Sequence, residues 1–173
     1  GRRGALGRFT LELARAAEHH PDIEARLAIS RQNAILDEFE PFRRRLTLVP
    51  TFAPALSHRL LTGFPAARRA LLAAIAEHRS EAAVTLMPHV WSPLIAPAVR
   101  RAGVAYATVI HDSRRHEGDR TGLVHGWLMR DARSADRVFT LSRFVADQLA
   151  ADGVVKPDRI TPLFHPDLVF GGG

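Results

Sequence analysis

A run of nine residues, Val104 to Asp112, constrains the fold of this chain more than any other segment. It is Val-Ala-Tyr-Ala-Thr-Val-Ile-His-Asp, so apolar and β-branched residues fill it until two ionisable residues end it. This composition is typical of a parallel strand that is covered on both faces. The run therefore predicts a buried strand, with His111 and Asp112 where strand gives way to loop. In open α/β sheets, ligands bind outside the carboxyl ends of the strands, so this point predicts the floor of a binding site.

The composition is that of one ordinary soluble domain. The chain has 173 residues, of which 46% are hydrophobic and 24% charged, enough for a proper core. Cysteine is absent, which excludes disulfides and thiolate chemistry. No apolar run approaches the roughly 20 residues that span a bilayer, and no signal peptide is visible. We expect a cytoplasmic location, with the inner face of a membrane as an alternative.

The chain is strongly basic, with a formal net charge of +6 and a pI of about 11.2. Such a charge is found in proteins that bind nucleic acid, anionic lipid or phosphorylated ligands. Here nearly all of it is arginine, Lys156 being the only lysine, which suits a GC-rich genome. The arginines are scattered over several predicted helices and form no single basic arm. We therefore expect no nucleic-acid partner.

Strand and helix patterns alternate along the chain. Strands are predicted near residues 25–30, 46–50, 83–87, 104–110, 135–141 and 157–164, and helices near residues 9–19, 31–39, 66–78, 92–102, 122–134 and 143–153. Residues 43–45, 52–64 and 114–121 are predicted as connections. This alternation predicts an α/β protein with a mostly parallel sheet between two layers of helices, joined by right-handed crossovers.

A glycine-bearing turn, Gly4-Ala5-Leu6-Gly7-Arg8, precedes the first helix. Glycines let the backbone approach a ligand closely, and a helix N-terminus favours an anion, so the turn is a candidate phosphate site. The alternative is a simple tight turn. Arg8 either meets the charge of a ligand or is a solvated residue at a helix end.

Polar and aromatic residues also follow the strand predicted at 83–87. Ser92 is predicted to cap the next helix, with Pro93 at its first position. His89 and Trp91 could form a sugar-binding pair, because the indole offers a flat face; alternatively Trp91 is a core residue beside the helix start. For His111 and Asp112 the alternatives are a structural strand end and a cap of the following turn.

Several other kinds of site are excluded. His19 and His20 are adjacent, so in a helix they point about 100° apart, and no carboxylate stands at ligand spacing, which argues against a metal site. The sequence contains no Gly-x-Ser-x-Gly elbow, no Walker A loop and no complete Gly-x-Gly-x-x-Gly fingerprint.

Four patterns then occur in a characteristic order: the turn at Gly4–Phe9, the strand end Val109–Asp112, the strand-to-helix segment Ala135–Phe144, and Asp158–Leu163. In this order the chain resembles the N-terminal half of a retaining GT-B glycosyltransferase of the large family 4, also called glycosyltransferase group 1. Each pattern alone is loose, and the resemblance rests on their order and spacing over almost the whole chain.

The resemblance implies an architecture and an activity. In that family two Rossmann-like domains face each other across a cleft, the first shaping the acceptor site and the second binding the nucleotide-sugar. Residues 1–173 would then be a single Rossmann-like domain, a fragment without its first strand and its C-terminal donor-binding domain. The complete bacterial enzyme would be a hexosyltransferase of polysaccharide biosynthesis, and the fragment alone would be inactive.

The resemblance also implies ligands and residue roles. The donor would be a nucleotide-diphosphate sugar, the acceptor a carbohydrate or a lipid with peripheral membrane contact, and no metal or cofactor is expected. The implied site residues are His111 as the catalytic residue, Gly4, Gly7 and Arg8 at the donor phosphates, and His89, Trp91 and Asp112 in the acceptor cleft. Two departures stand out: Ala5 replaces the usual second glycine, and His165-Pro166-Asp167 replaces an Asn-Gly-Val-Asp turn.

A second hypothesis belongs to a different class of protein. The chain could be a non-catalytic Rossmann-like binding module whose basic surface holds an anionic partner. Binding to polyanions that weakens with salt, and that does not depend on His111, would distinguish this module from the transferase.

Overall fold

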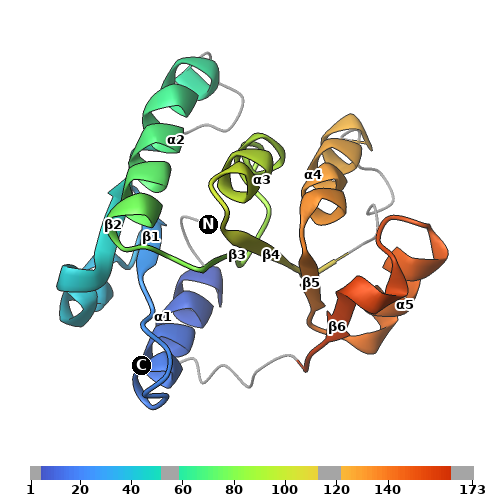
Figure 1. The fold of residues 1–173 in the computed structure, drawn as a ribbon, viewed down its shortest axis with the longest axis horizontal. Helices are drawn as coiled ribbons and strands as arrows, with labels where there is room; N and C mark the ends of the chain where they lie inside the picture. Colours follow the sequence, from blue (N-terminus) through green and yellow to red (C-terminus); the bar gives the residue numbers. More distant parts are fainter. Residues whose placement is uncertain (1–4, 52–58, 113–121, 165–173) are drawn as a thin grey trace. The chain divides into compact units, whose positions relative to one another are not determined.

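The computed structural model describes residues 5–51, 59–112 and 122–164 (Figure 1). The chain forms two compact units, the first ending at His78 and the second spanning Arg79–Pro166. Each unit is described by itself.

The first unit joins two helices, a 3₁₀ segment and two strands. Its elements are α1 (Ala5–Glu18), β1 (Leu27–Ser30), η1 (Leu36–Arg45), β2 (Leu46–Val49) and α2 (Arg59–Glu77). β1 and β2 pair in parallel, with Leu27 opposite Leu46. This pairing brings the carboxyl ends of both strands to one edge of the small sheet.

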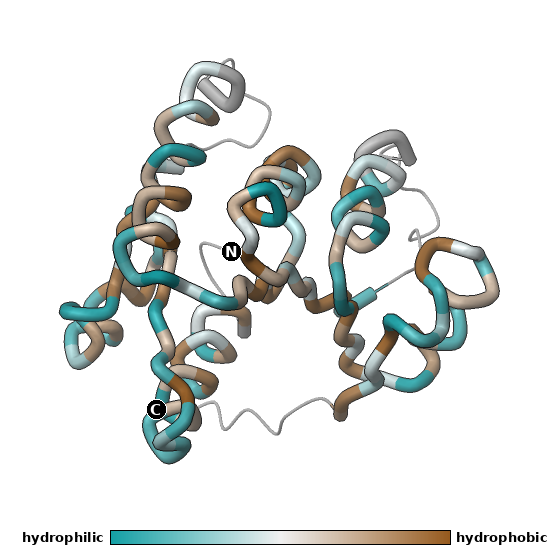
Figure 2. Tube along the Cα trace, viewed as in Figure 1, coloured by the Kyte–Doolittle hydropathy of each residue, from teal (hydrophilic) through white to brown (hydrophobic). Residues whose placement is uncertain are grey.

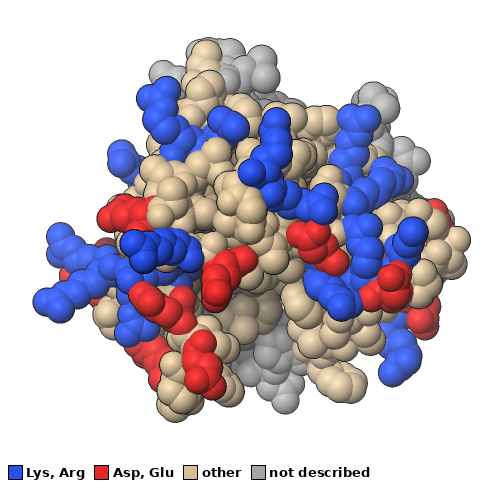
Figure 3. All heavy atoms as spheres, in the orientation of Figure 1, with Lys and Arg blue, Asp and Glu red and all other residues tan. Residues whose placement is uncertain are grey.

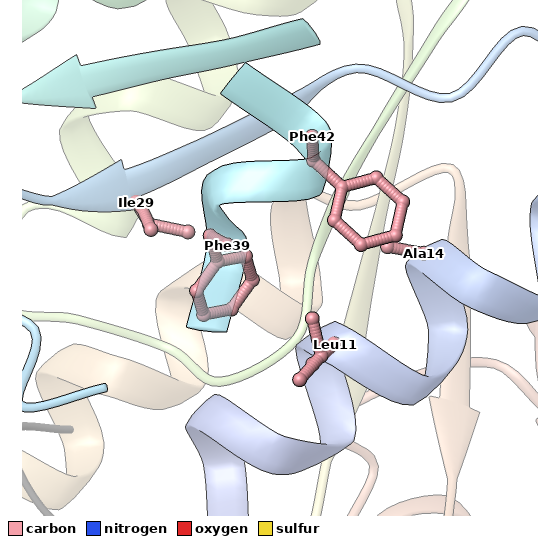
Figure 4. Packing of buried hydrophobic residues seen from close by; sticks show 5 residues of the cluster. All are labelled: Leu11, Ala14, Ile29, Phe39 and Phe42. Carbon is pink, nitrogen blue, oxygen red and sulfur yellow. The ribbon is translucent and has the colours of Figure 1, made fainter. Parts of the chain in front are cut away.

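A hydrophobic cluster holds α1, β1 and η1 together (Figure 4). Leu11 and Ala14 stand three residues apart on α1 and so share one face of the helix. Phe39 and Phe42 repeat that spacing on η1, and Ile29 of β1 completes the cluster. Burial of these side chains is the main force that fixes the three elements against one another.

The second unit is an open parallel sheet with crossover helices. Its elements are β3 (Ala82–Thr85), α3 (Ser92–Arg101), β4 (Ala105–Ile110), α4 (Gly122–Ser134), β5 (Arg137–Thr140), α5 (Arg143–Ala151), η2 (Pro157–Arg159) and β6 (Ile160–Pro162). The strands lie in the order β3-β4-β5-β6, all parallel.

The strand order places the helices. The strands cross the sheet in sequence order, so right-handed crossovers bring their helices to the same face. Figure 1 shows α3 and α4 side by side there, and hydrophobic residues line the central strands in Figure 2. Because all four strands are parallel, their carboxyl ends form a single edge.

Asp136 stabilises the opposite, amino-terminal end of the β4–β5 pair. Its carboxylate accepts a hydrogen bond from the Tyr106 backbone N–H at 2.9 Å, and its own N–H donates to the Tyr106 carbonyl at 2.7 Å. Arg100 lies 2.8 Å from the same carboxylate. The hydrogen bond from the Tyr106 backbone, helped by Arg100, lowers the pKa of Asp136 below its ordinary value. The Ala-Asp-x-Val pattern of the sequence thus marks a structural position away from the strand-end edge.

The predicted fold class is confirmed: the protein is α/β, with parallel sheets and crossover helices. The central strand occupies Ala105–Ile110, and α4 has the predicted bounds. Ser142 caps α5, since its side chain accepts from the Val145 N–H at 3.2 Å. Gly103 follows α3 and has a φ of 79°, a conformation that glycine adopts without strain.

Two helix predictions and one predicted connection need correction. The helix predicted at 31–39 is the 3₁₀ segment η1, which begins later because the Asn33 side chain accepts from the Ile35 N–H in a turn. η1 also includes residues 43–45, which were predicted to be a connection. α2 begins at Arg59 and contains the exposed Pro65. One proline removes a single helical hydrogen bond, and the rest of this 19-residue helix outweighs that loss.

Candidate functional site

The carboxyl edge of the second unit gathers the polar residues that follow its strands. The segment Leu86–Trp91, called here the β3–α3 loop, leaves β3 at this edge. His111 and Asp112 leave β4 next to it, because Thr85 of β3 pairs with Thr108 of β4. Parallel pairing therefore brings together the two segments that carry the predicted catalytic and acceptor residues.

His111 is tied to the β3–α3 loop. Its ring Nε2 lies 2.8 Å from the Leu86 carbonyl oxygen, and the side chain is half-buried. A carbonyl only accepts hydrogen bonds, so Nε2 carries the proton and donates it. His111 is thus held in one ring orientation and, when neutral, in one tautomer.

The β3–α3 loop is also closed by its own hydrogen bonds. The His89 N–H donates to the Ser92 hydroxyl at 2.9 Å, and the Trp91 N–H donates to Nδ1 of His89 at 3.3 Å. Ser92 is therefore the first residue of α3 and not its cap; Trp91 occupies the cap position, without a side-chain bond. Pro93 stands in the first turn, one position later than predicted.

His89 has one ring nitrogen bonded inside the loop. Its Nδ1 accepts a hydrogen bond, so in the neutral ring Nε2 bears the proton and is a donor. The residue is exposed, yet surrounding atoms desolvate the ring enough to lower the pKa of His89 below its ordinary value. The lowered pKa favours the neutral ring, whose Nε2–H is then a hydrogen-bond donor at the strand-end edge.

Trp91 is a core residue. Only 5% of it is exposed, and it meets the His89 ring edge-on, with centroids 5.1 Å apart and planes at 71°. A covered indole offers no free face for a sugar ring, so its burial favours the core alternative over the acceptor-cleft role. The contact instead helps to set the orientation of His89.

Trp127 of α4 contributes a contact that the sequence pattern did not single out. Its indole N–H donates to the Val90 carbonyl at 2.7 Å, and the Arg130 guanidinium lies 5.5 Å from the ring centroid. The β3–α3 loop is thus held from β4 by His111 and from α4 by Trp127.

A buried polar network lies beneath the same edge. Asp131 of α4 is fully buried, and its carboxylate lies 2.8 Å from both the Tyr106 and the Thr108 hydroxyls. The Tyr106 hydroxyl also lies 2.8 Å from the Thr85 hydroxyl. An ionised carboxylate only accepts, so Tyr106 then donates to Asp131 and accepts from Thr85. The network joins β3, β4 and α4 immediately below the strand ends.

Burial dominates the ionisation of this network. It raises the pKa of Asp131, although the Tyr106 and Thr108 hydroxyls stabilise the carboxylate and oppose the rise. It also raises the pKa of Tyr106, with a further contribution from the charge of Asp131. Tyr106 therefore stays protonated and remains a hydrogen-bond donor.

Asp112 is exposed at the start of the segment that leaves β4. The predicted polar loop at 114–121 lies outside the described residues, as do Gly4 and His165-Pro166-Asp167.

The remaining predicted site residues belong to the first unit. Gly7 lies inside α1 and is buried, so the predicted turn is helical from Ala5 onward. A Cβ atom at Gly7 would stand 2.9 Å from Cδ1 of Ile35, which ties the glycine to helix packing. Arg8 points to η1, where its guanidinium lies 3.4 Å from the Glu38 carboxylate.

Exposed arginines lie over α3 and α4 (Figure 3). We call Arg100, Arg101, Arg130 and Arg133 the arginine group. Of its members, Arg100 pairs with Asp136. Within the described residues, no three His, Cys, Asp or Glu side chains are grouped as metal ligands would be. Among the described helices, none has the length and apolar character needed to cross a membrane.

The parallel sheets and the polar strand-end edge define a Rossmann-like domain of the kind found in GT-B proteins. A family model, the Glycosyl transferase 4-like domain, matches residues 4–163. The chain therefore belongs to the glycosyl transferase 4-like family. No curated protein matches its sequence.

Two solved structures share the fold. One is a Listeria monocytogenes protein assigned as a UDP-N-acetylglucosamine 2-epimerase, with a TM-score of 0.67 and 15% identity over 87% of this chain. The other is Glycyrrhiza uralensis UGT73P12 in complex with glycyrrhetinic acid 3-O-monoglucuronide, with a TM-score of 0.51 and 12% identity over 94% of the chain. The chain spans 40% and 46% of their respective lengths, less than half of each.

Proposed function

We propose that this chain is the acceptor-side domain of a retaining glycosyltransferase. The complete enzyme moves a hexose from a nucleotide-diphosphate sugar to a lipid or a growing polysaccharide. The chain covers less than half of its structural neighbours, which supports a donor-binding domain elsewhere in the enzyme. The observation that carries the proposal is His111, fixed to Leu86 at the carboxyl edge of a sheet in a glycosyl transferase 4-like chain.

In this proposal the strand-end edge has two roles. His111 lies at the transfer point and interacts with the reacting sugar, where positioned donors and acceptors stabilise developing charge. The Nε2–H of His89 donates to an acceptor oxygen, and Asp112 accepts from an acceptor hydroxyl. Gly4 and Arg8 serve the donor diphosphate, Arg8 by exchanging its Glu38 partner for phosphate, while Gly7 lets Ile35 pack against α1.

The proposal includes conditions outside the domain. Transfer needs no metal ion or cofactor, because the arginines and backbone N–H groups of the complete enzyme neutralise the diphosphate. The enzyme works in the cytoplasm, and with a lipid acceptor the arginine group contacts anionic headgroups at the inner membrane surface.

The test is a transfer assay on the protein made from its complete reading frame. A panel of nucleotide sugars is offered with lipid-linked and oligosaccharide acceptors, and the product anomer is determined by NMR. We expect transfer from one donor with the anomeric configuration of that donor kept. Hydrolysis or epimerisation without transfer to any acceptor would contradict the proposal, and an inverted anomer would contradict its retaining mechanism.

The arginine group favours one second candidate, the non-catalytic module for an anionic partner. Four exposed guanidinium groups on neighbouring helices make a surface suited to phosphate or carboxylate. Under this alternative the chain binds inorganic polyphosphate with strong salt dependence. Replacing the four arginines by glutamine then abolishes binding, while His111→Ala leaves it unchanged.

A further inference from the structure

α4 carries two inward side chains one turn apart, each bonded to a different part of the strand-end edge. Trp127 donates a hydrogen bond to the Val90 carbonyl at 2.7 Å. The Asp131 carboxylate accepts hydrogen bonds from the Tyr106 and Thr108 hydroxyls, each at 2.8 Å. Residues at i and i+4 lie on the same face of a helix, so both act from the face that packs on the sheet.

These bonds form a closed path through the candidate site. From Asp131 the path runs through Tyr106 to Thr85, the last residue of β3. Leu86 follows Thr85 and accepts the bond from His111, three residues after Thr108. Thr108 closes the path by its bond to Asp131. A shift of β3 against β4 at this edge would break at least one of these bonds.

We infer that Trp127 and Asp131 are positioning residues, which hold the β3–α3 loop and the end of β4 so that His111 and His89 keep their orientations. Trp127 fixes the far end of the loop through Val90, while the Asp131 network fixes its near end through Thr85. The two histidine rings lie between these anchors. The value of this arrangement for sugar transfer rests on the proposed function, whereas the arrangement itself is a property of the chain.

Burial explains why these hydrogen bonds can fix the position of the β3–α3 loop. The carboxylate of Asp131 and the hydroxyls of Tyr106 and Thr108 have no access to water, so each must keep its protein partner. Thr85 links this network to the loop: if the end of β3 moved, the Tyr106 hydroxyl would lose its bond to Thr85, and Trp127 and His111 would lose their bonds to the loop carbonyls. These losses favour one arrangement of the loop. A purely apolar contact has no such direction and tolerates sliding.

The test uses the full chain and two readouts independent of sugar transfer. Hydrogen exchange follows the His89 and Trp91 amides, which are held by bonds inside the loop. ¹⁵N NMR of the imidazole ring reports the tautomer of His111, assigned by the signal that His111→Gln removes. The variants are Trp127→Phe, which keeps a ring but removes the N–H, and Asp131→Leu, which replaces the carboxylate by an apolar side chain and so removes the acceptor.

In both variants we expect the His89 and Trp91 amides to exchange about 5-fold faster or more than in the wild type. This is the factor that corresponds to the loss of one hydrogen bond. The His111 signal should change from a single Nε2–H tautomer to a mixture. Protection in β5 and α5 should stay as in the wild type, which shows that the unit is folded. Arg130→Gln is the matched control, because it changes the exposed side of Trp127 without touching the Val90 bond.

Unchanged exchange and an unchanged tautomer in both folded variants would overturn the inference. A general loss of protection in Asp131→Leu would make its effect structural, and Trp127→Phe together with Thr108→Val would then decide the matter. Because no readout involves transfer, these results stand apart from the activity assay. A failed transfer assay would not contradict the positioning inference. Unchanged exchange and tautomer would likewise not contradict the proposed transferase function.

Discussion

Single residues decide what the candidate site can do. The hydrogen bond from His111 to Leu86 fixes which ring nitrogen carries the proton, and the Trp91-to-His89 bond does the same for its neighbour. Neither bond could be inferred from the sequence: the Leu86 carbonyl is brought to His111 only by strand pairing, and the local Trp91-to-His89 bond depends on the conformation of the β3–α3 loop. The sequence did place His111 at a strand end, because a run of buried residues is recognisable by composition.

At the residue scale, removal of the Asp131 carboxylate tests the buried network. Asp131→Ala leaves the Tyr106 and Thr108 hydroxyls without their acceptor, at about 1–3 kcal/mol of unfolding free energy for each. Asp131→Asn should lose much less, since an amide can accept from Thr108 and donate to Tyr106, which then donates to Thr85. Urea denaturation measures both, and equal losses in the two variants would argue against the network.

Asp131 and Asp136 should respond to pH in opposite directions. Burial raises the pKa of Asp131 in the folded state, so its contribution to stability falls as pH rises from its ordinary value of 3.8 through the raised value. The Tyr106 backbone lowers the pKa of Asp136, whose contribution is present above the ordinary value and falls as pH drops below it.

The measurement is urea denaturation between pH 3 and pH 7. As the pH rises from 3 to 7, the unfolding free energy of the wild type should fall relative to that of Asp131→Asn. Over the same range it should rise relative to that of Asp136→Asn. The same direction for both variants would show that one of these carboxylates lies in a different environment from the one described.

At the scale of elements, packing explains where the sequence patterns were sufficient and where they were not. β4 and α4 were predictable because composition and periodicity alone determine a buried strand and a helix with one apolar face. The first turn of α1 was not, because glycines indicate a turn unless a neighbour requires their small size. Gly7 has such a neighbour in Ile35, which is distant in sequence and close only after η1 packs on α1.

A double-mutant cycle tests this explanation of Gly7. Alanine is a better helix former than glycine by about 1 kcal/mol, but its Cβ would stand 2.9 Å from Cδ1 of Ile35. Ile35→Val removes that atom, so Gly7→Ala should be more favourable in the Ile35→Val background by roughly 0.5–1 kcal/mol. Thermal or urea unfolding of the four proteins gives the coupling. Zero coupling would show that packing against Ile35 does not explain the glycine at position 7. It would favour the alternative that the Gly7 backbone approaches a ligand.

At the scale of the whole molecule, the fold class and the family followed from the order of patterns, although each pattern alone is weak. The Ala-Asp-x-Val pattern belongs to the amino-terminal end of β5 and supports the sheet, while the His-Asp pattern lies at the opposite edge. A family can therefore be predicted from residues that stabilise the fold as well as from those of its site.

The proposed metal independence is also tested on the whole enzyme. If arginines and backbone groups alone neutralise the donor diphosphate, the transfer rate should be unchanged in about 10 mM EDTA, an excess of chelator over any metal bound to the enzyme. A loss of transfer that Mg²⁺ or Mn²⁺ restores would contradict this part of the proposal.

The most direct measurement of the central claim is the transfer rate of His111 variants of the complete enzyme. His111→Ala and His111→Gln should both lower kcat by about 10²-fold or more, because the reacting sugar loses the imidazole. A glutamine side chain can still donate a hydrogen bond to the Leu86 carbonyl. His111→Gln therefore distinguishes a role of the imidazole in transfer from a role in holding the loop. His125→Gln on α4 is the control and should keep the wild-type rate. Transfer restored by His111→Gln would show that the histidine only holds the β3–α3 loop, and would contradict its place at the transfer point.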